Sequence, residues 1–89
     1  MNKIEFKKII EDGRTRGKKY MVVKIETEGN PGVEIILNPS ENFGQKVKYY
    51  DQAYNDYMEL TTALGAGKLI RITDVLMTSN LSDLSWFVY

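Results

Sequence analysis

The stretch NPSENFGQKVKYYDQAYNDYMELTTALGAG, residues 38–67, carries the pattern on which the predicted fold depends. Ser40 is suited to cap a helix. Pro39 disfavours helical backbone at Asn38, the residue before it, and the serine side chain can accept a hydrogen bond from the first free N–H groups. Gly65-Ala66-Gly67 suits the other end, since glycine adopts the left-handed conformation that ends helices. Between them, seven side chains recur at intervals of four and three, which is one face of a helix: Phe43, Val47, Tyr50, Tyr54, Tyr57, Thr61 and Leu64.

This pattern predicts one long helix from Ser40 to Leu64. The second half of the stretch also allows a different structure. Asn55 and Asp56 favour turns, and they could end the helix early and leave residues 57–60 extended. The unbroken stripe favours the longer helix, with Tyr50, Tyr54 and Tyr57 in the core.

The residues before this stretch predict a short helix and a β-hairpin. Residues 2–12, NKIEFKKIIED, begin with Asn2 as an N-cap and Glu5 three residues later, and Gly13 is suited to end that helix. A strand over residues 4–10 is the weaker alternative.

The hairpin comes from residues 18–28, KKYMVVKIETE, the turn Gly29-Asn30-Pro31-Gly32, and the returning residues 33–37. Alternation in the first strand places its apolar side chains on one face. In the returning strand we expect Val33, Ile35 and Leu37 to face the core and Glu34 and Ile36 to face solvent.

The residues after the long helix predict a third strand, over residues 68–77, KLIRITDVLM. Asp74 interrupts its apolar set, so we expect a bulge or a strand end there. The chain then ends in Trp86-Phe87-Val88-Tyr89, which either forms a fourth strand or contacts a partner.

The predicted fold class is therefore α+β, with the order α-β-β-α-β and an optional final strand. We expect a small antiparallel or mixed sheet with a β-hairpin, and helices, one of them long, packed on one face. Residues 1–89 are short enough to form a single small globular domain.

The composition excludes several chemistries. The chain contains no histidine and no cysteine, which rules out Ser-His-Asp and Cys-His nucleophiles and zinc sites built from these residues. Asp51, Asp56 and Glu59 are the closest approach to an acidic cluster, and we interpret them as a solvated helix face rather than a metal site. We predict no catalytic residues, no metal and no cofactor.

The sequence also predicts where in the cell the protein is located. Residues 1–5 lead into a mixed polar segment rather than the apolar region of a secretion signal, and no apolar run is long enough to cross a bilayer. The lack of cysteine fits a reducing compartment. We expect a cytoplasmic protein with no membrane partner.

Charge is unevenly distributed along the chain. Residues 1–19 hold seven bases and three acids, which gives 7 − 3 = +4, and residues 20–89 hold five bases and nine acids, which gives 5 − 9 = −4. Because the net charge is zero, mutual attraction of the two parts within the fold is the simpler interpretation. The densest group of basic residues is nevertheless a candidate nucleic-acid contact. Its cations would bind phosphates and its aromatic ring would stack on a base. The residues of this group are Arg14, Arg16, Lys18, Lys19 and Tyr20.

Aromatic residues are numerous, with six tyrosines, three phenylalanines and one tryptophan. Large aromatic side chains either fill a small core or contribute to protein interfaces. Tyr49 lies off the helix stripe, and the aromatic residues at the C-terminus lie outside every predicted core element except an optional strand. These residues form the candidate protein interface: Trp86, Phe87, Tyr89 and Tyr49.

Four segments resemble a known group of proteins: Ile35–Phe43 (IILNPSENF), Tyr49-Tyr50, Ala53–Asp56 and Ile70–Ile72. Over residues 20–73 the chain resembles small uncharacterised proteins encoded by phages and prophages of Gram-positive bacteria. The resemblance implies a mobile-element setting, in which small proteins bind host or phage macromolecules. It implies no activity and no site residues.

Two hypotheses of function follow. The first is a non-catalytic protein-interaction module that self-associates or binds a partner protein. The alternative is a nucleic-acid-binding accessory protein that uses the basic residues 14–19. An enzyme is not expected, because it would have to work with carboxylates, tyrosines and lysines alone.

Overall fold

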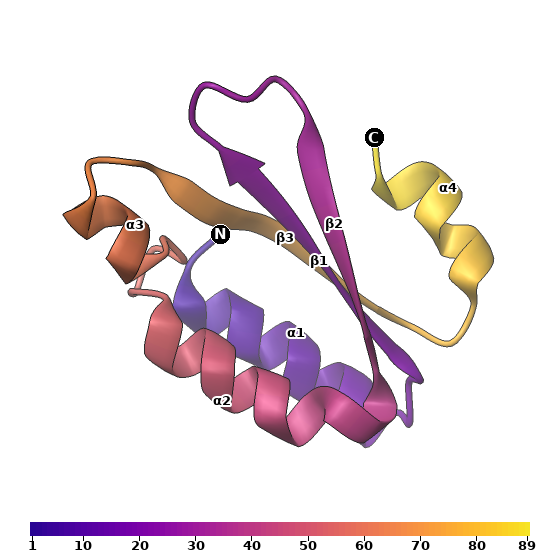
Figure 1. Cartoon of the computed structure of the whole chain (residues 1–89). Helices are drawn as coiled ribbons and strands as arrows, with labels where there is room; N and C mark the ends of the chain where they lie inside the picture. Colours follow the sequence, from indigo (N-terminus) through magenta and orange to yellow (C-terminus); the bar gives the residue numbers. More distant parts are fainter.

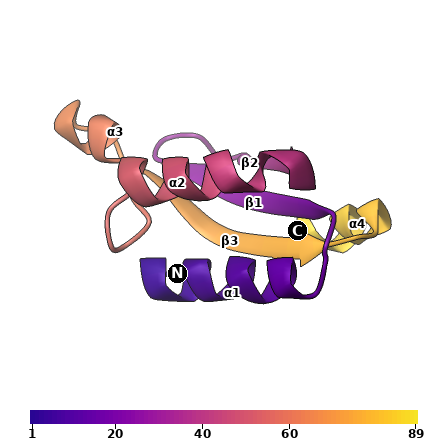
Figure 2. The ribbon, with the colours of Figure 1, turned by 90° about the horizontal axis from the view of Figure 1, so that it is seen from below.

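The computed structural model describes residues 1–89 and has an α+β fold around one antiparallel sheet with strand order β2-β1-β3 (Figure 1). Seen from below (Figure 2), α1 runs beside β3 and α2 runs beside β2. Both helices cover the same face of the sheet, because side chains of both pack in one core. The helices and strands are α1 (Lys3–Thr15), β1 (Tyr20–Thr27), β2 (Val33–Pro39), α2 (Phe43–Ala53), α3 (Thr61–Gly65), β3 (Ile70–Thr78) and α4 (Leu84–Phe87).

The first helix begins as predicted and ends later. Asn2 is its N-cap, and the Asn2 Oδ1 atom accepts a hydrogen bond of 2.8 Å from the Glu5 N–H. Gly13 does not end the helix, which continues to Thr15. Gly13 is buried instead, because α1 approaches β3 so closely there that a Cβ atom on residue 13 would lie 2.3 Å from Cβ of Met77.

The predicted hairpin is confirmed, but β2 presents the opposite face to the core. The register places Ile36 across from the fully buried Val23, and opposed residues share one face of a sheet. Ile36 therefore packs against the core, whereas Val33 and Leu37 are 48% and 43% exposed. The expected inward set was wrong although it is the apolar set of the alternation. The pairing with β1 puts Ile36 on the core side, together with Asn38, whose buried amide is hydrogen-bonded there.

A bulge in β3 confirms the interruption predicted at Asp74. Lys24 pairs with Asp74 while its neighbour Ile25 pairs with Ile72, so Thr73 is the extra residue of β3. The extra residue restores the alternation, and Ile72 and Val75 are both buried on the face covered by α1 and α2.

The single long helix is wrong, and the alternative with an early end is the one that forms. α2 ends at Ala53, where the Lys3 Nζ group donates hydrogen bonds to the carbonyls of Asp51 and Tyr54. A cation is favourable at this negative end of a helix. Asn55 then holds a tight turn, because its Oδ1 atom accepts from the Tyr57 N–H at 2.9 Å and from the Glu59 N–H at 3.0 Å.

The segment after this turn runs along the outer edge of β3. The Leu60 N–H donates to the Ile70 carbonyl at 2.8 Å, and the Ile72 N–H donates to the Met58 carbonyl at 2.9 Å. Met58 is fully buried in consequence, and Tyr57 is 73% exposed although the helix stripe placed it in the core. Tertiary hydrogen bonds thus outweigh the helical pattern in this segment.

The core lies between the sheet and the two long helices. Tyr50 and Tyr54 are buried there as predicted, and the ring of Phe6 from α1 meets that of Tyr50 edge-on with centroids 5.5 Å apart. Asn38 of β2 is buried in the same layer, where its Nδ2 group donates to the Met21 carbonyl at 3.3 Å and to the Tyr50 hydroxyl at 3.4 Å.

The two buried tyrosines predict a loss of stability in alkali. Burial raises the pKa of Tyr54 to about 12, with a smaller contribution from Tyr49, and burial also raises the pKa of Tyr50. The folded protein therefore holds these phenol protons more tightly than the unfolded chain, in which tyrosine titrates near ~10. The stabilisation is complete below pH ~10 and is lost as the pH rises through ~12. Urea unfolding across this range should show a free energy of unfolding that falls more steeply in the wild-type protein than in Tyr54→Phe; equal slopes would contradict the assignment.

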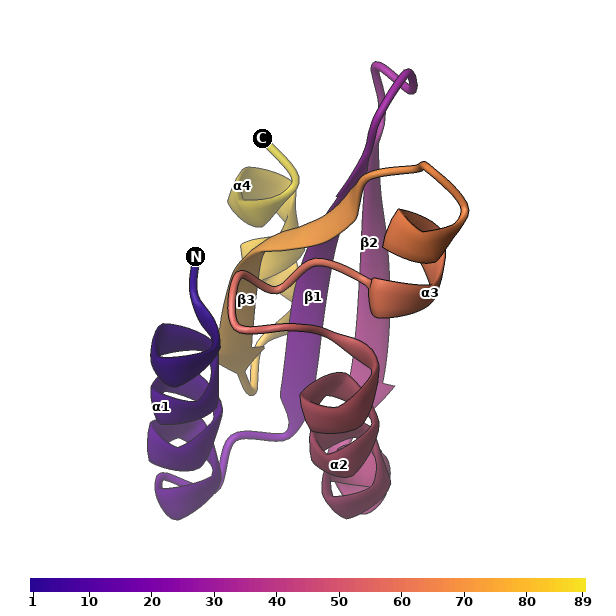
Figure 3. The same cartoon turned by 90° about the vertical axis from the view of Figure 1, so that its left-hand side faces the viewer.

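The C-terminal residues form a short helix rather than the optional fourth strand. The Asp83 carboxylate, just before α4, accepts hydrogen bonds from the Thr78 hydroxyl at 2.7 Å and from the Trp86 ring N–H at 3.2 Å. Figure 3 shows that α4 lies on the opposite side of the sheet from α1 and α2. Phe87 is buried there, with its ring centroid 4.6 Å from the Nζ atom of Lys24. None of the helices has the length and apolar content that a membrane span needs.

Candidate protein-interaction surface

The four residues predicted to form a protein interface do not lie together. Trp86 and Tyr89 are 58% and 98% exposed at the C-terminus, whereas Phe87 between them is buried. Tyr49 is half exposed on α2, on the other face of the sheet, where its ring packs edge-on against that of Tyr50 at 5.3 Å. The exposed part of the predicted set is therefore reduced to two residues on one face.

These two residues share that face with apolar side chains of β2. Val33, Ile35 and Leu37 alternate with the core-facing residues of β2 and so point away from α1 and α2. α4 covers only part of this face, because its buried side chain, Phe87, lies over Lys24 of the central strand. We call the exposed or half-exposed apolar residues of this side of the sheet the open face: Val33, Ile35, Leu37, Trp86, Val88 and Tyr89.

The open face adjoins a free strand edge. β2 is an outer strand, and no backbone group of residues 33–38 makes a hydrogen bond to a segment outside the sheet. The outer edge of β3 differs, since residues 58–60 occupy its first half. An unpaired edge with apolar neighbours is a surface on which another strand can pair.

The sequence pattern did not identify Val33 and Leu37 as surface residues, because their expected orientation was inward. The adjacent pair Ile35-Ile36 was the only signal, since two consecutive apolar residues in a strand indicate apolar side chains on both faces. A three-stranded sheet with helices on one face leaves the second face for other contacts.

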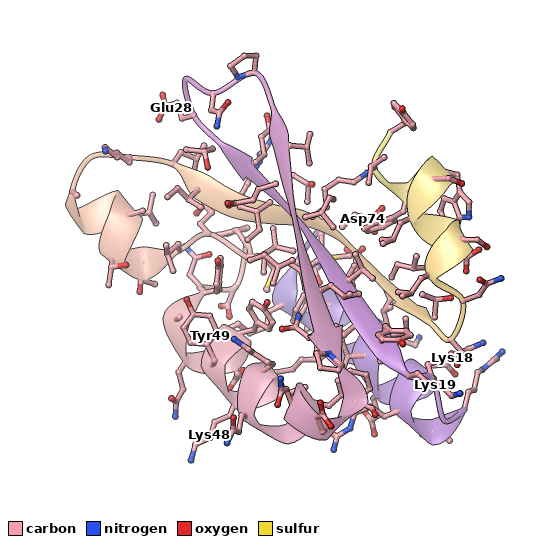
Figure 4. The ribbon with its side chains drawn as sticks, turned by 45° about the vertical axis from the view of Figure 1, so that its right-hand side comes forward. Lys18, Lys19, Glu28, Lys48, Tyr49 and Asp74 are labelled. Atoms are coloured by element: carbon pink, nitrogen blue, oxygen red, sulfur yellow. The ribbon has the colours of Figure 1, made fainter.

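The basic residues predicted as a nucleic-acid contact do gather at one end of the molecule. Figure 4 shows Lys18 and Lys19 at the end opposite Glu28 of the hairpin turn. A hollow of about 310 Å³ there is lined by Arg14, Gly17, Lys18, Lys19, Ser40 and Phe43. Two predicted residues have other contacts: the Arg16 Nε atom lies 3.1 Å from the Asp12 carboxylate, and Tyr20 is half-buried as the first residue of β1.

The acidic residues considered for a metal site are separated. Asp51 lies 2.6 Å from the Lys7 Nζ atom, and this hydrogen bond holds the pKa of the Asp51 carboxyl below its ordinary value. Glu59 accepts a hydrogen bond from Asn55 instead. No three acidic side chains are grouped so that they could hold a metal ion.

Comparisons with protein-family models, with curated proteins and with solved structures found no match to this chain.

Proposed function

We propose that the chain is a non-catalytic protein-interaction module that associates through its open face and the free edge of β2. The observation that supports this most directly is the position of exposed apolar and aromatic side chains beside an unpaired strand. The proposal includes a mobile-element setting, which rests on the resemblance to phage and prophage proteins, and a cytoplasmic location, which rests on the lack of cysteine.

An interface of standard size would take up a modest part of the protein surface. A standard interface buries about 800 Å² on each partner, which is roughly one seventh of the 5712 Å² that this chain exposes. Tryptophan and tyrosine contribute strongly to interfaces, because their large rings lose little conformational entropy when buried. A second copy of the chain is one such partner, and its net charge of zero adds no long-range repulsion.

The proposal predicts that Leu37→Lys weakens association at least about tenfold, because the lysine would place a charge in the apolar contact. Sedimentation velocity over a range of concentrations measures self-association. Trp86, the one tryptophan of the chain, reports it independently, since its emission shifts to the blue when the ring leaves water.

Ile4→Lys is the matched control. Ile4 is 79% exposed, but it lies on α1, on the other side of the sheet, and its replacement should leave association unchanged. If the wild-type protein is monomeric at every concentration and retains no protein from a bacterial lysate, the proposal is wrong.

The basic end of the molecule supports a second candidate function, nucleic-acid binding. Three of the predicted contacts, Arg14, Lys18 and Lys19, line one hollow there. The same lysate experiment separates the two functions when half of the lysate is treated with nuclease. Retention that is lost on treatment, together with affinity that falls steeply with salt, would favour the nucleic-acid function.

A further inference from the structure

A groove of about 440 Å³ runs along the second half of the outer edge of β3, and α1 forms its other wall. Its four apolar lining residues are Ile9 of α1 and Val75, Leu76 and Met77 of β3. The close contact between α1 and β3 at Gly13 lies within this groove. The groove belongs to neither the open face nor the edge of β2.

The backbone of β3 has free hydrogen-bonding groups in this groove. In an antiparallel pair, alternate residues direct their N–H and C=O groups away from the partner strand. Ile72 directs its N–H outward, to the Met58 carbonyl, and with the extra residue at the bulge the next outward residues are Val75 and Met77. No backbone hydrogen bond to a segment outside the sheet involves either residue.

One of these groups already has a partner. The Val75 N–H donates to the Asp74 carboxylate at 2.8 Å, which protects the strand edge at that point. The Val75 carbonyl and both backbone groups of Met77 have no such cover. An extended peptide that lies along β3 would pair with these three groups.

The side chains around the groove favour an acidic peptide. Lys8, Arg16 and Lys18 border it, and Asp12 is the one acid among its lining residues. Asp12 forms the ion pair with Arg16, and Asp74 lies at the groove edge through its hydrogen bond to the Val75 N–H, so these five residues carry a net charge of 3 − 2 = +1. Its lining includes no aromatic ring on which a nucleic-acid base would stack.

We propose that this groove binds an extended peptide segment with acidic side chains, which adds to β3 as a fourth strand beyond the bulge. Apolar side chains of the peptide would meet Ile9 and Met77, and its carboxylates would meet Lys8 and Lys18. This inference goes beyond the proposed function, because it assigns a separate site and a chemical class of ligand.

Selection of a displayed library of random dodecapeptides against the intact protein tests the proposal. We expect enriched peptides with net negative charge and alternating apolar residues. Lys8→Glu and Lys18→Glu should each weaken the binding of an enriched peptide about tenfold. Lys48→Glu is the matched control, because Lys48 is an exposed lysine on α2, away from the groove, and should have no effect (Figure 4).

Amide hydrogen exchange identifies the mode of binding. The Met77 amide should exchange more slowly in the complex, whereas the Val75 amide, already bonded to Asp74, should change little. Enrichment of no peptides or of basic ones, binding insensitive to both groove variants, or an unchanged Met77 amide would each overturn the proposal. A thymidine oligonucleotide that displaces the peptide, and whose affinity falls equally in Lys8→Glu and Lys18→Glu, would also overturn the proposal. Leu37→Lys should leave peptide binding intact, so that failure of the proposed function is distinguished from failure of this inference.

Discussion

Replacing Gly13 by alanine will destabilise the protein by about 2 kcal/mol. The added Cβ atom would lie 2.3 Å from Cβ and 2.5 Å from Cγ of Met77, far inside van der Waals contact. Cβ of Met77 is fixed to the backbone of β3 at a residue that pairs with Met21 of the central strand, so relief requires α1 to move away from the sheet. The better helix propensity of alanine, about 1 kcal/mol, offsets only part of this cost. Thermal unfolding should show a midpoint lower by about 10 °C.

Gly44→Ala is the matched control for this prediction. Gly44 also lies in a helix, α2, but nothing lies within 4 Å of the position its Cβ would occupy. The same substitution should therefore stabilise the protein by about 0.5–1 kcal/mol. Two changes of the same sign would show that propensity, rather than the contact with Met77, sets the outcome.

Phe87→Ala will destabilise the protein by about 3 kcal/mol, even though Phe87 is only two residues from the end of the chain. The ring is 3% exposed and lies against Lys24 on the face of the sheet opposite α1 and α2. Val22 of the central strand is fully buried, and it shares this face because it alternates with the core-facing residues of β1. Loss of the ring leaves a cavity that the short helix α4 cannot fill. Urea unfolding measures the effect.

Trp86→Ala tests the same assignment from the neighbouring position. Trp86 is more than half exposed, and its replacement should lower the free energy of unfolding by about 1 kcal/mol, the contribution of its hydrogen bond to Asp83. It should also weaken the association proposed for the open face. Similar losses of stability from both substitutions would contradict the placement of α4.

Part of the candidate site could be predicted from the sequence. The sequence predicts Trp86 and Tyr89 either in a fourth strand or at an interface, and both are exposed. The burial of Phe87 was not predictable, since it depends on α4 folding back over the central strand. The exposure of Val33 and Leu37 depends on the register with β1, which the residues of β2 do not specify.

The sequence by itself determined the features that depend on neighbouring residues. Asn2 caps α1 because its side chain reaches the N–H group three residues later. The turn at residues 29–32 forms the hairpin, and the interruption at Asp74 marks the bulge. The α+β class follows from the order of such local elements.

Only the tertiary structure decided where elements end and which faces they bury. α2 ends at Ala53 because Lys3 binds its last carbonyls and because residues 58–60 pair with β3, and both contacts join segments distant in the sequence. Gly13 is internal to α1 because β3 lies against it. A helical stripe or a strand alternation specifies which residues share one face. The free energy gained by burying that face depends on the segment that packs against it, and this segment comes from a distant part of the chain.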